Sequence, residues 1–125
     1  MATVQVRYIV HDVDVAIAFY TTHLGFTLLS KQAPAFADVR RGSLRLLLSG
    51  ATSSAGRPMP DGERPKPGGW NRIHLIVDDL PAEVALLRAA GVKFRNDIVT
   101  GPGGSQILLV DPSGNLVELF QPARH

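Results

Sequence analysis

The chain has 125 residues, which suits one compact domain, and its lack of cysteine excludes disulfides, thiolate catalysis and cysteine-ligated zinc sites. Its formal net charge is only +2 and its Lys and Arg residues form no basic run, so we expect no nucleic-acid partner. No apolar run approaches the ~20 residues of a membrane helix and no signal-peptide pattern begins the chain, so we expect a cytoplasmic location and no membrane partner.

The first part of the chain predicts one β-α-β-β-β unit. Residues 4–10 alternate in polarity, with Gln5 and Arg7 on one face, which indicates a half-buried strand. Asp12 is a suitable N-cap for a helix whose apolar residues recur at helical spacing, and Gly25 is placed to end that helix. Three short apolar segments then predict strands over 26–30, 35–40 and 43–49.

Residues 50–69 differ in composition, because they are rich in proline and glycine and show almost no apolar periodicity. A connection of about 20 residues exceeds the usual length, so we expect a loop that is either disordered or covers a site. The loop contains Met59 and is followed directly by Trp70. We favour a cover, because these two side chains could close over a pocket.

The second part repeats the pattern. Residues 72–77 alternate as a strand, with Arg72 and His74 on one face, and Asp78 or Asp79 caps the helix that follows. One face of this predicted helix is lined by Leu80, Val84, Leu87 and Ala90. Short strands over 94–100, a turn over 101–104 and a closing hairpin over 107–120 complete the unit.

The closing hairpin turns at residues 111–115 and carries Glu118 in its second strand. Leu116, Glu118 and Phe120 share one side of that strand. A carboxylate in an otherwise apolar strand is costly unless it meets water, a cation or a metal. Glu118 is therefore the leading candidate for a functional residue.

A constant offset of 67 residues aligns the two parts, and one gap extends the match to the glycine after each helix. The aligned pairs are Val10 with Val77, Asp12 with Asp79, Val13 with Leu80, and Gly25 with Gly91. Such a repeat implies two similar modules, 3–49 and 70–122, joined by the loop 50–69 within a single domain spanning 1–125. We predict an α+β fold of two tandem βαβββ modules whose curved sheets surround a cleft.

Three segments resemble the vicinal oxygen chelate superfamily, which contains glyoxalase I, bleomycin-resistance and fosfomycin-resistance proteins and extradiol dioxygenases. They are Asp14 to Phe26 with its Phe-Tyr and Leu-Gly-Phe motifs, Ile73 to Asp79, and the closing Asp-Pro-Ser-Gly-Asn-Leu-Val-Glu-Leu at 111–119. The resemblance covers nearly the whole chain except the loop. It implies the glyoxalase/bleomycin-resistance fold, which hosts isomerases, lyases, dioxygenases and non-catalytic drug binders.

The catalytic families of that superfamily hold a divalent metal with one His, Glu or Gln from each of four strands. The resemblance places Gln5, Leu46 or Leu47, Arg72 and Glu118 at those positions. Leucine has no lone pair to offer and arginine cannot be deprotonated, so we predict no cofactor. If a divalent metal is bound, its ligands would be Gln5, His74 and Glu118.

The physical alternative to a metal is that Arg72 takes its place and pairs with Glu118. The predicted ligand-binding residues are Gln5, Arg7, Arg72, His74, Glu118, Trp70 and Met59. Such a site resembles the bleomycin-resistance type, which sequesters an aromatic or amphipathic metabolite or antibiotic without metal.

An enzyme of the same superfamily is the alternative function. It would be a lyase, isomerase or dioxygenase, either with a divalent metal at the degenerate site or with His74 and Glu118 as acid and base. In both cases the resemblance implies a homodimer that binds a small organic molecule.

Overall fold

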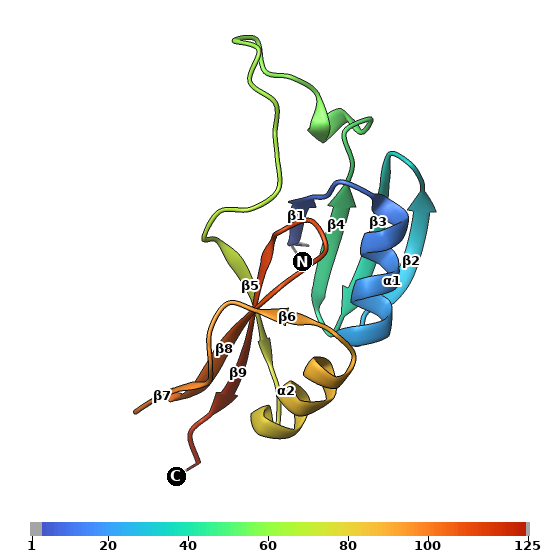
Figure 1. Ribbon diagram of the computed structural model, residues 1–125. Coiled ribbons are helices and arrows are strands. Elements are labelled where there is room, and N and C mark those ends of the chain that lie inside the picture. The colour runs from blue at the N-terminus through green and yellow to red at the C-terminus, as the bar shows by residue number, and fades with distance from the viewer. Residues whose placement is uncertain (1–3, 125) are drawn as a thin grey trace. The chain divides into compact units, whose positions relative to one another are not determined.

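Two compact units make up the chain, residues 1–68 and residues 69–125, and a computed structural model describes residues 4–124. The predicted start of the first module at residue 3 lies outside the described part. Each unit holds one α-helix and one mixed sheet, of four strands in the first unit and five in the second (Figure 1). The predicted α+β class with two related modules is confirmed. Neither helix is long and apolar enough to cross a membrane, among the residues described.

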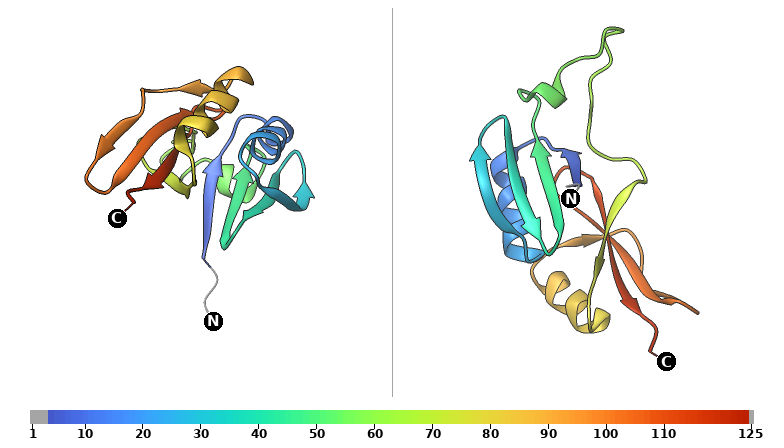
Figure 2. Two further views of the ribbon diagram at one scale, coloured as in Figure 1. Left: turned by 90° about the horizontal axis from the view of Figure 1, so that it is seen from below. Right: turned by 180° about the vertical axis from the view of Figure 1, so that it is seen from behind.

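The first unit follows the predicted order of elements. They are β1 (Gln5–Ile9), α1 (Val13–His23), β2 (Thr27–Gln32), β3 (Phe36–Arg41) and β4 (Leu44–Ser49), with the 3-10 turn η1 (Ser54–Gly56) in the loop. The strand order is β1-β4-β3-β2, in which only the β1–β4 pair is parallel. Helix α1 lies against one face of this sheet (Figure 2), where Tyr20, Leu46 and Leu48 are fully buried.

The second unit repeats this topology with one change. Its elements are β5 (Arg72–Ile76), α2 (Leu80–Ala89), β6 (Lys93–Phe94), β7 (Val99–Gly101), β8 (Gly104–Val110) and β9 (Leu116–Pro122). The order β5-β9-β8-β6 matches that of the first sheet, and β7 also pairs with β8. The strand equivalent to β2 is thus split, because β6 pairs near Leu109 and β7 pairs near Ser105, toward opposite ends of β8.

The repeated helix caps explain why both helices begin where they do. The carboxylates of Asp12 and Asp79 accept hydrogen bonds from the backbone N–H groups of Val15 and Ala82, at 3.0 and 3.1 Å. Of the two predicted caps for α2, the structure therefore selects Asp79. Three residues of the predicted helical face, Leu80, Val84 and Leu87, are buried in α2, whereas α2 ends at Ala89 and Ala90 is its exposed C-cap.

The register of β1 against β4 decides which leucine shares a face with Gln5. Arg7 pairs with Leu47, and side chains of directly paired residues point to the same side of a sheet. Leu47 therefore lies with Gln5 and Arg7 on the face opposite α1, whereas Leu46 lies on the helix side with none of its surface exposed. We call the side of each sheet opposite its helix the helix-free face.

The turn between β8 and β9 is built around Asp111, which is only 3% exposed. Its Oδ1 accepts hydrogen bonds from the backbone N–H groups of Ser113 and Asn115, each at 2.8 Å. Gly114 adopts a φ of +90°, a conformation that other residues rarely take. These contacts confirm the predicted tight reversal and hold β8 and β9 in register.

Candidate functional site

Three polar side chains meet on the helix-free face of the second sheet. Because β5 and β9 are parallel neighbours, His74 is registered beside Glu118 and Arg72 beside Leu116. Oε1 of Glu118 accepts a hydrogen bond from Nε of Arg72 at 3.1 Å and lies 3.0 Å from Nη2. Oε2 lies 3.3 Å from Nε2 of His74. The predicted pairing of Arg72 with Glu118 is confirmed.

The contacts of Glu118 matter for stability because its side chain is mostly buried. The side chain of Glu118 is 10% exposed, against 32% for Arg72 and 47% for His74. A carboxylate withdrawn from water is costly unless a partner replaces its hydration. Arg72 supplies the compensating charge and His74 supplies a second polar contact. The carboxylate is thus satisfied, while the side chains of Arg72 and His74 remain partly exposed.

An aromatic side chain supports His74 from the same face. The ring of Phe120 lies 4.9 Å from the imidazole, centroid to centroid, and is tilted by 53°. Phe120 and Glu118 are two residues apart on β9, so both point to the helix-free face. The face therefore combines an ionic pair with an adjoining aromatic surface.

The residues at the four metal positions do not fit a metal ion. Leu47 has no lone pair to donate, and the guanidinium of Arg72 engages the carboxylate of Glu118 that a cation would need. Of the three fallback ligands, the structure brings His74 and Glu118 together, whereas Gln5 lies exposed on β1 of the first unit. Within the described residues of either unit, no three His, Asp or Glu side chains gather into a possible metal site.

The helix-free face of the first sheet carries an ion pair and a hydrogen-bonded arginine of its own. Asp38, which is 4% exposed, forms an ion pair with Arg45, and Nη1 of Arg7 donates to Oγ of Ser49 at 3.0 Å. The hydrogen bond to Asp38 raises the pKa of the Arg45 guanidinium, against the opposing effect of desolvation. Arg7, predicted as a ligand contact, is thus anchored to β4.

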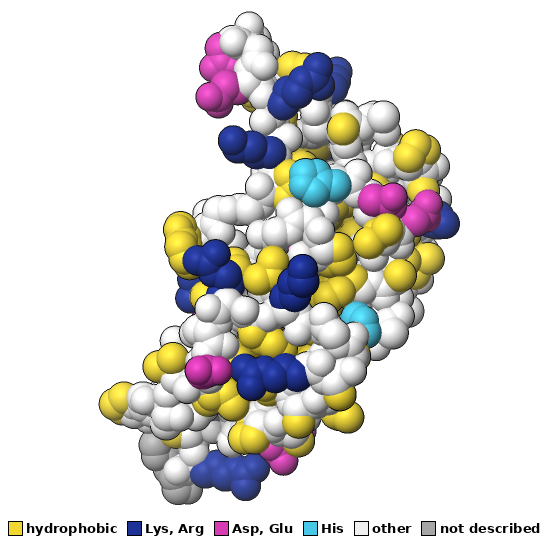
Figure 3. Space-filling model, in the orientation of Figure 1, with side chains coloured by type: hydrophobic (Ala, Val, Ile, Leu, Met, Phe, Trp, Pro, Cys, Tyr) yellow, Lys and Arg dark blue, Asp and Glu magenta, His cyan; other side chains and the backbone are white. Residues whose placement is uncertain are grey.

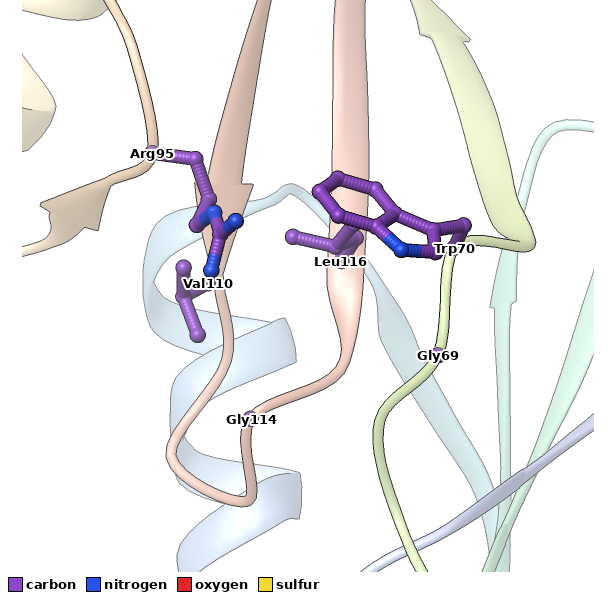
Figure 4. Close-up of a pocket in the computed structure, with 6 residues that line it drawn as sticks. All are labelled: Gly69, Trp70, Arg95, Val110, Gly114 and Leu116. Atoms are coloured by element: carbon purple, nitrogen blue, oxygen red, sulfur yellow. The ribbon is translucent and has the colours of Figure 1, made fainter.

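A cavity of about 350 Å³ opens on the second unit near the β8–β9 turn (Figure 4). Val110 and Leu116, directly paired across β8 and β9, line it together with two larger side chains, Trp70 and Arg95. The guanidinium carbon of Arg95 lies 5.0 Å from the centre of the Trp70 ring. The remaining lining residues are Gly69 and Gly114. Trp70, predicted as a ligand contact, therefore borders a cavity.

Arg95 is the charged residue of the cavity, and the sequence does not mark it as a ligand contact. It lies between β6 and β7, in a segment without a clear polar–apolar period, so neither helix nor strand parity assigns it a direction. Its backbone N–H donates to the carbonyl of Leu108 at 2.8 Å, which places it beside β8. Only this long-range contact brings Arg95 to Trp70.

Met59, the other predicted stacking residue, belongs to the Pro- and Gly-rich loop of the first unit. It is 48% exposed, and its backbone N–H donates to the carbonyl of Glu63 at 2.7 Å. Gly62 in turn donates to the carbonyl of Met59 at 2.8 Å. Met59 therefore lies in a local turn of the loop.

Basic side chains do not gather into a continuous patch on the face drawn in Figure 3. The Lys and Arg side chains drawn there form several small groups among hydrophobic and other side chains. Such scattering differs from the basic stripe typical of nucleic-acid-binding domains.

Comparisons with known proteins agree with this architecture. No curated protein matches the chain. Among solved structures, a member of the glyoxalase/bleomycin resistance protein/dioxygenase superfamily from Sphaerobacter thermophilus is 26% identical, covers 97% of both chains and has a TM-score of 0.77. Lactoylglutathione lyase from Agrobacterium tumefaciens is 22% identical over 96% of this chain and 92% of its own, with a TM-score of 0.76. At 22% identity, the similarity to this lyase shows a shared fold and nothing about activity.

A third similar structure is TnmS3, an antibiotic binding protein from a Streptomyces species. It is 28% identical, covers 98% of this chain and 99% of its own, and has a TM-score of 0.69. The family model described as Glyoxalase/Bleomycin resistance protein/Dioxygenase superfamily matches residues 3–119, which is most of the chain. This protein therefore belongs to the glyoxalase/bleomycin resistance protein/dioxygenase superfamily.

Proposed function

We propose that this chain is a small-molecule binding protein that sequesters an aromatic or amphipathic metabolite or antibiotic without a metal. The observation that carries the proposal is the engagement of Glu118 by Arg72. The resemblance to catalytic families would put a metal-ligating side chain where Arg72 stands. A guanidinium at that place repels a cation and can instead bind a carbonyl or acidic group of a ligand.

Similarity to TnmS3 also supports this proposal. That protein is described as antibiotic binding, and the two chains match over nearly their full lengths at 28% identity. We propose Arg72, His74 and Trp70 as ligand contacts, since each is partly exposed on the second unit. Glu118 would act through Arg72 and His74, holding both side chains in place.

A second candidate is an enzyme of the same superfamily that acts as a lyase, isomerase or dioxygenase. The contact of 3.3 Å between His74 and Glu118 favours it, because such a pair can hold and transfer a proton. The imidazole is about half exposed, so a substrate could reach it.

Elemental analysis and ligand recovery separate the two candidates. Protein purified without chelator should contain well under one equivalent of Zn, Mn, Ni or Fe. Bleomycin, added as a probe, should bind and be recovered chemically unchanged, as judged by mass spectrometry. A stoichiometric transition metal that is lost in Glu118→Gln, or conversion of the bound probe, would contradict the proposal and favour the enzyme.

We also propose that the chain functions as a homodimer. Strand β2 lies at the edge of its sheet, all six of its residues are exposed, and Leu28 and Leu29 are 39% and 45% exposed. An exposed edge with apolar side chains is suited to pairing with a second chain.

Light scattering tests the dimer. It should give the mass of two chains, and Leu29→Lys should shift the measured mass toward that of the monomer. Leu86→Lys, which changes an exposed leucine of α2, is the matched control and should leave the dimer intact.

A further inference from the structure

The cavity beside Trp70 combines an aromatic ring, an apolar surface and a guanidinium in one unit of the chain. The indole of Trp70 is 64% exposed, although large aromatic side chains are usually mostly buried. Leu116, by contrast, is 4% exposed. The cavity thus offers a flat ring and an apolar base within reach of one positive charge (Figure 4).

The charge on Arg95 lacks a carboxylate partner among the described residues. Arg72 pairs with Glu118, and Arg88 pairs with Asp97, the nearest acidic residue to Arg95 in sequence. The side-chain contact of Arg95 is instead with the Trp70 ring, at 5.0 Å. A cation over an aromatic face keeps its ability to form hydrogen bonds in the plane of its guanidinium. Arg95 can therefore bind an anion without first breaking an ion pair.

Hydrogen bonds to backbone groups anchor both walls of the cavity. On one side, Arg95 donates its backbone N–H to the carbonyl of Leu108, and the backbone N–H of Leu108 donates to Oδ1 of Asn96 at 3.0 Å. On the other side, Nη1 of Arg72 donates to the carbonyl of Trp70 at 3.2 Å. The two binding groups are thus attached to strands β8 and β5. This reduces the entropy that a ligand would lose in ordering them.

We infer that this cavity binds a small planar aromatic anion, with its ring stacked on Trp70 and its carboxylate or similar group held by Arg95. The inference rests on the proposed binding function and specifies its ligand class. A volume of about 350 Å³ lies at the lower end of ordinary ligand sites, so it suits a compound of one or two fused rings. Gly69 and Gly114 carry no side chains, and an added Cβ would meet no heavy atom within 4 Å at either, so this side of the cavity is open.

The test uses 2-naphthoate, a two-ring carboxylate, and 2-naphthamide, its uncharged analogue. The chain has one tryptophan, so a single indole N–H signal in a ¹⁵N–¹H spectrum reports on Trp70. We expect that signal to shift saturably with 2-naphthoate. Calorimetric titration should show that 2-naphthamide binds about tenfold more weakly, because it cannot form a charge-assisted pair with Arg95.

Substitutions of Arg95 test whether this residue binds the carboxylate of 2-naphthoate. Arg95→Gln should weaken 2-naphthoate binding about tenfold and leave 2-naphthamide binding unchanged, while Arg95→Lys should restore part of the loss. Arg88→Gln is the matched control, because Arg88 also lies over an aromatic ring, 5.1 Å from the centre of Phe94, but does not line this cavity. Its affinity for 2-naphthoate should equal that of the unmodified chain.

Several outcomes would overturn the inference: equal affinity for the two probes, no loss in Arg95→Gln, or binding without a shift of the indole signal. Different results would show that the proposed function itself is wrong. A chain that retains bleomycin unchanged but does not bind 2-naphthoate has the proposed function and a different ligand class. Turnover of bleomycin or a stoichiometric metal would contradict the proposed function, whatever 2-naphthoate does.

Discussion

Arg72 and Glu118 form their ion pair diagonally across neighbouring strands. Arg72 is registered beside Leu116 on β9, and Glu118 is registered two residues further along, beside His74. Diagonal neighbours on one face are about 7 to 8 Å apart at the backbone, a gap that a long arginine side chain can bridge. The shorter His74 side chain occupies the direct position. Glu118 can therefore contact both partners at once.

Breaking this pair should destabilise the protein. Arg72→Met leaves the mostly buried carboxylate of Glu118 without its charge partner, and we expect a loss of about 1 to 2 kcal/mol in the free energy of unfolding. The partial exposure of Arg72 keeps the loss below that of a fully buried pair. Adding Glu118→Leu to Arg72→Met should recover most of the loss. Urea denaturation measures the free energy of unfolding of the unmodified chain, of Arg72→Met and of the double variant.

The control for this series is an exposed ion pair. Lys31 and Asp14 lie 2.7 Å apart, but their side chains are 49% and 63% exposed. Water screens such a pair, so Lys31→Met should cost no more than about 0.5 kcal/mol. If Arg72→Met lowers the free energy of unfolding no more than Lys31→Met does, the burial of Glu118 has no energetic consequence.

Asp111 should be the most sensitive position of the β8–β9 turn. Asp111→Ala removes the carboxylate that accepts from the backbone N–H groups of Ser113 and Asn115, so we expect a loss of about 2 to 3 kcal/mol. Asp61→Ala is matched to it, since Asp61 accepts one local backbone bond from Glu63 at 2.9 Å in the exposed loop. That variant should lose under about 1 kcal/mol. Equal losses in chemical denaturation would argue against the role given to Asp111.

Gly104 should tolerate no side chain. Its φ is +148°, and an added Cβ would overlap the carbonyl oxygen of Gln121 and approach the Phe120 ring to 2.8 Å. Gly104→Ala should therefore cost about 2 to 4 kcal/mol through strain and overpacking. Gly103→Ala provides the comparison, because a Cβ there would meet no heavy atom within 4 Å. A thermal melt that shows similar stability for both variants would refute this reading of β8.

The two helix N-caps, Asp12 and Asp79, should contribute equally to the free energy of unfolding. Asp12→Ala and Asp79→Ala each remove one capping bond of similar length, and each should cost about 1 kcal/mol. Asp78→Ala changes the neighbouring exposed aspartate, which does not cap α2, and should be almost neutral. Circular dichroism during a urea titration measures the resulting loss in the free energy of unfolding. A cost at Asp78 equal to that at Asp79 would mean that the cap is assigned to the wrong residue.

Local chemistry determines much of this fold, and the sequence is sufficient for that part. Both N-caps, the glycines that follow the helices and the turn at 111–115 depend on residues close together in the chain. Gly25 and Gly91 adopt φ values of +70° and +86°, as expected for glycines that end helices. The parity of β5 and β9 also places Arg72, His74 and Glu118 on one face. Arg72 and His74 are two residues apart in β5, and Glu118 is the one carboxylate of a mostly apolar β9, so each could be assigned a face within its own strand.

Strand pairing decides what local patterns leave open. Leu46 and Leu47 are adjacent in a leucine-rich strand, so their alternation is not visible in the sequence, and only the register of Arg7 with Leu47 assigns their faces. The division of one predicted region into β6 and β7 likewise depends on contacts with β8. Ala90, assigned to the helical face by its spacing, instead forms the C-cap of α2, because the chain leaves the helix there for β6.

By itself, the sequence determined the duplicated module, the helix and turn boundaries to within a few residues, and the pairing of Arg72 with Glu118. Only the tertiary structure decided that Arg95 meets Trp70, although 24 residues and a helix separate them in the chain. The physical reason is the range of the interactions. Caps, turns and strand alternation act over a few residues, whereas the cavity depends on how β6, β8 and β9 pair across the sheet.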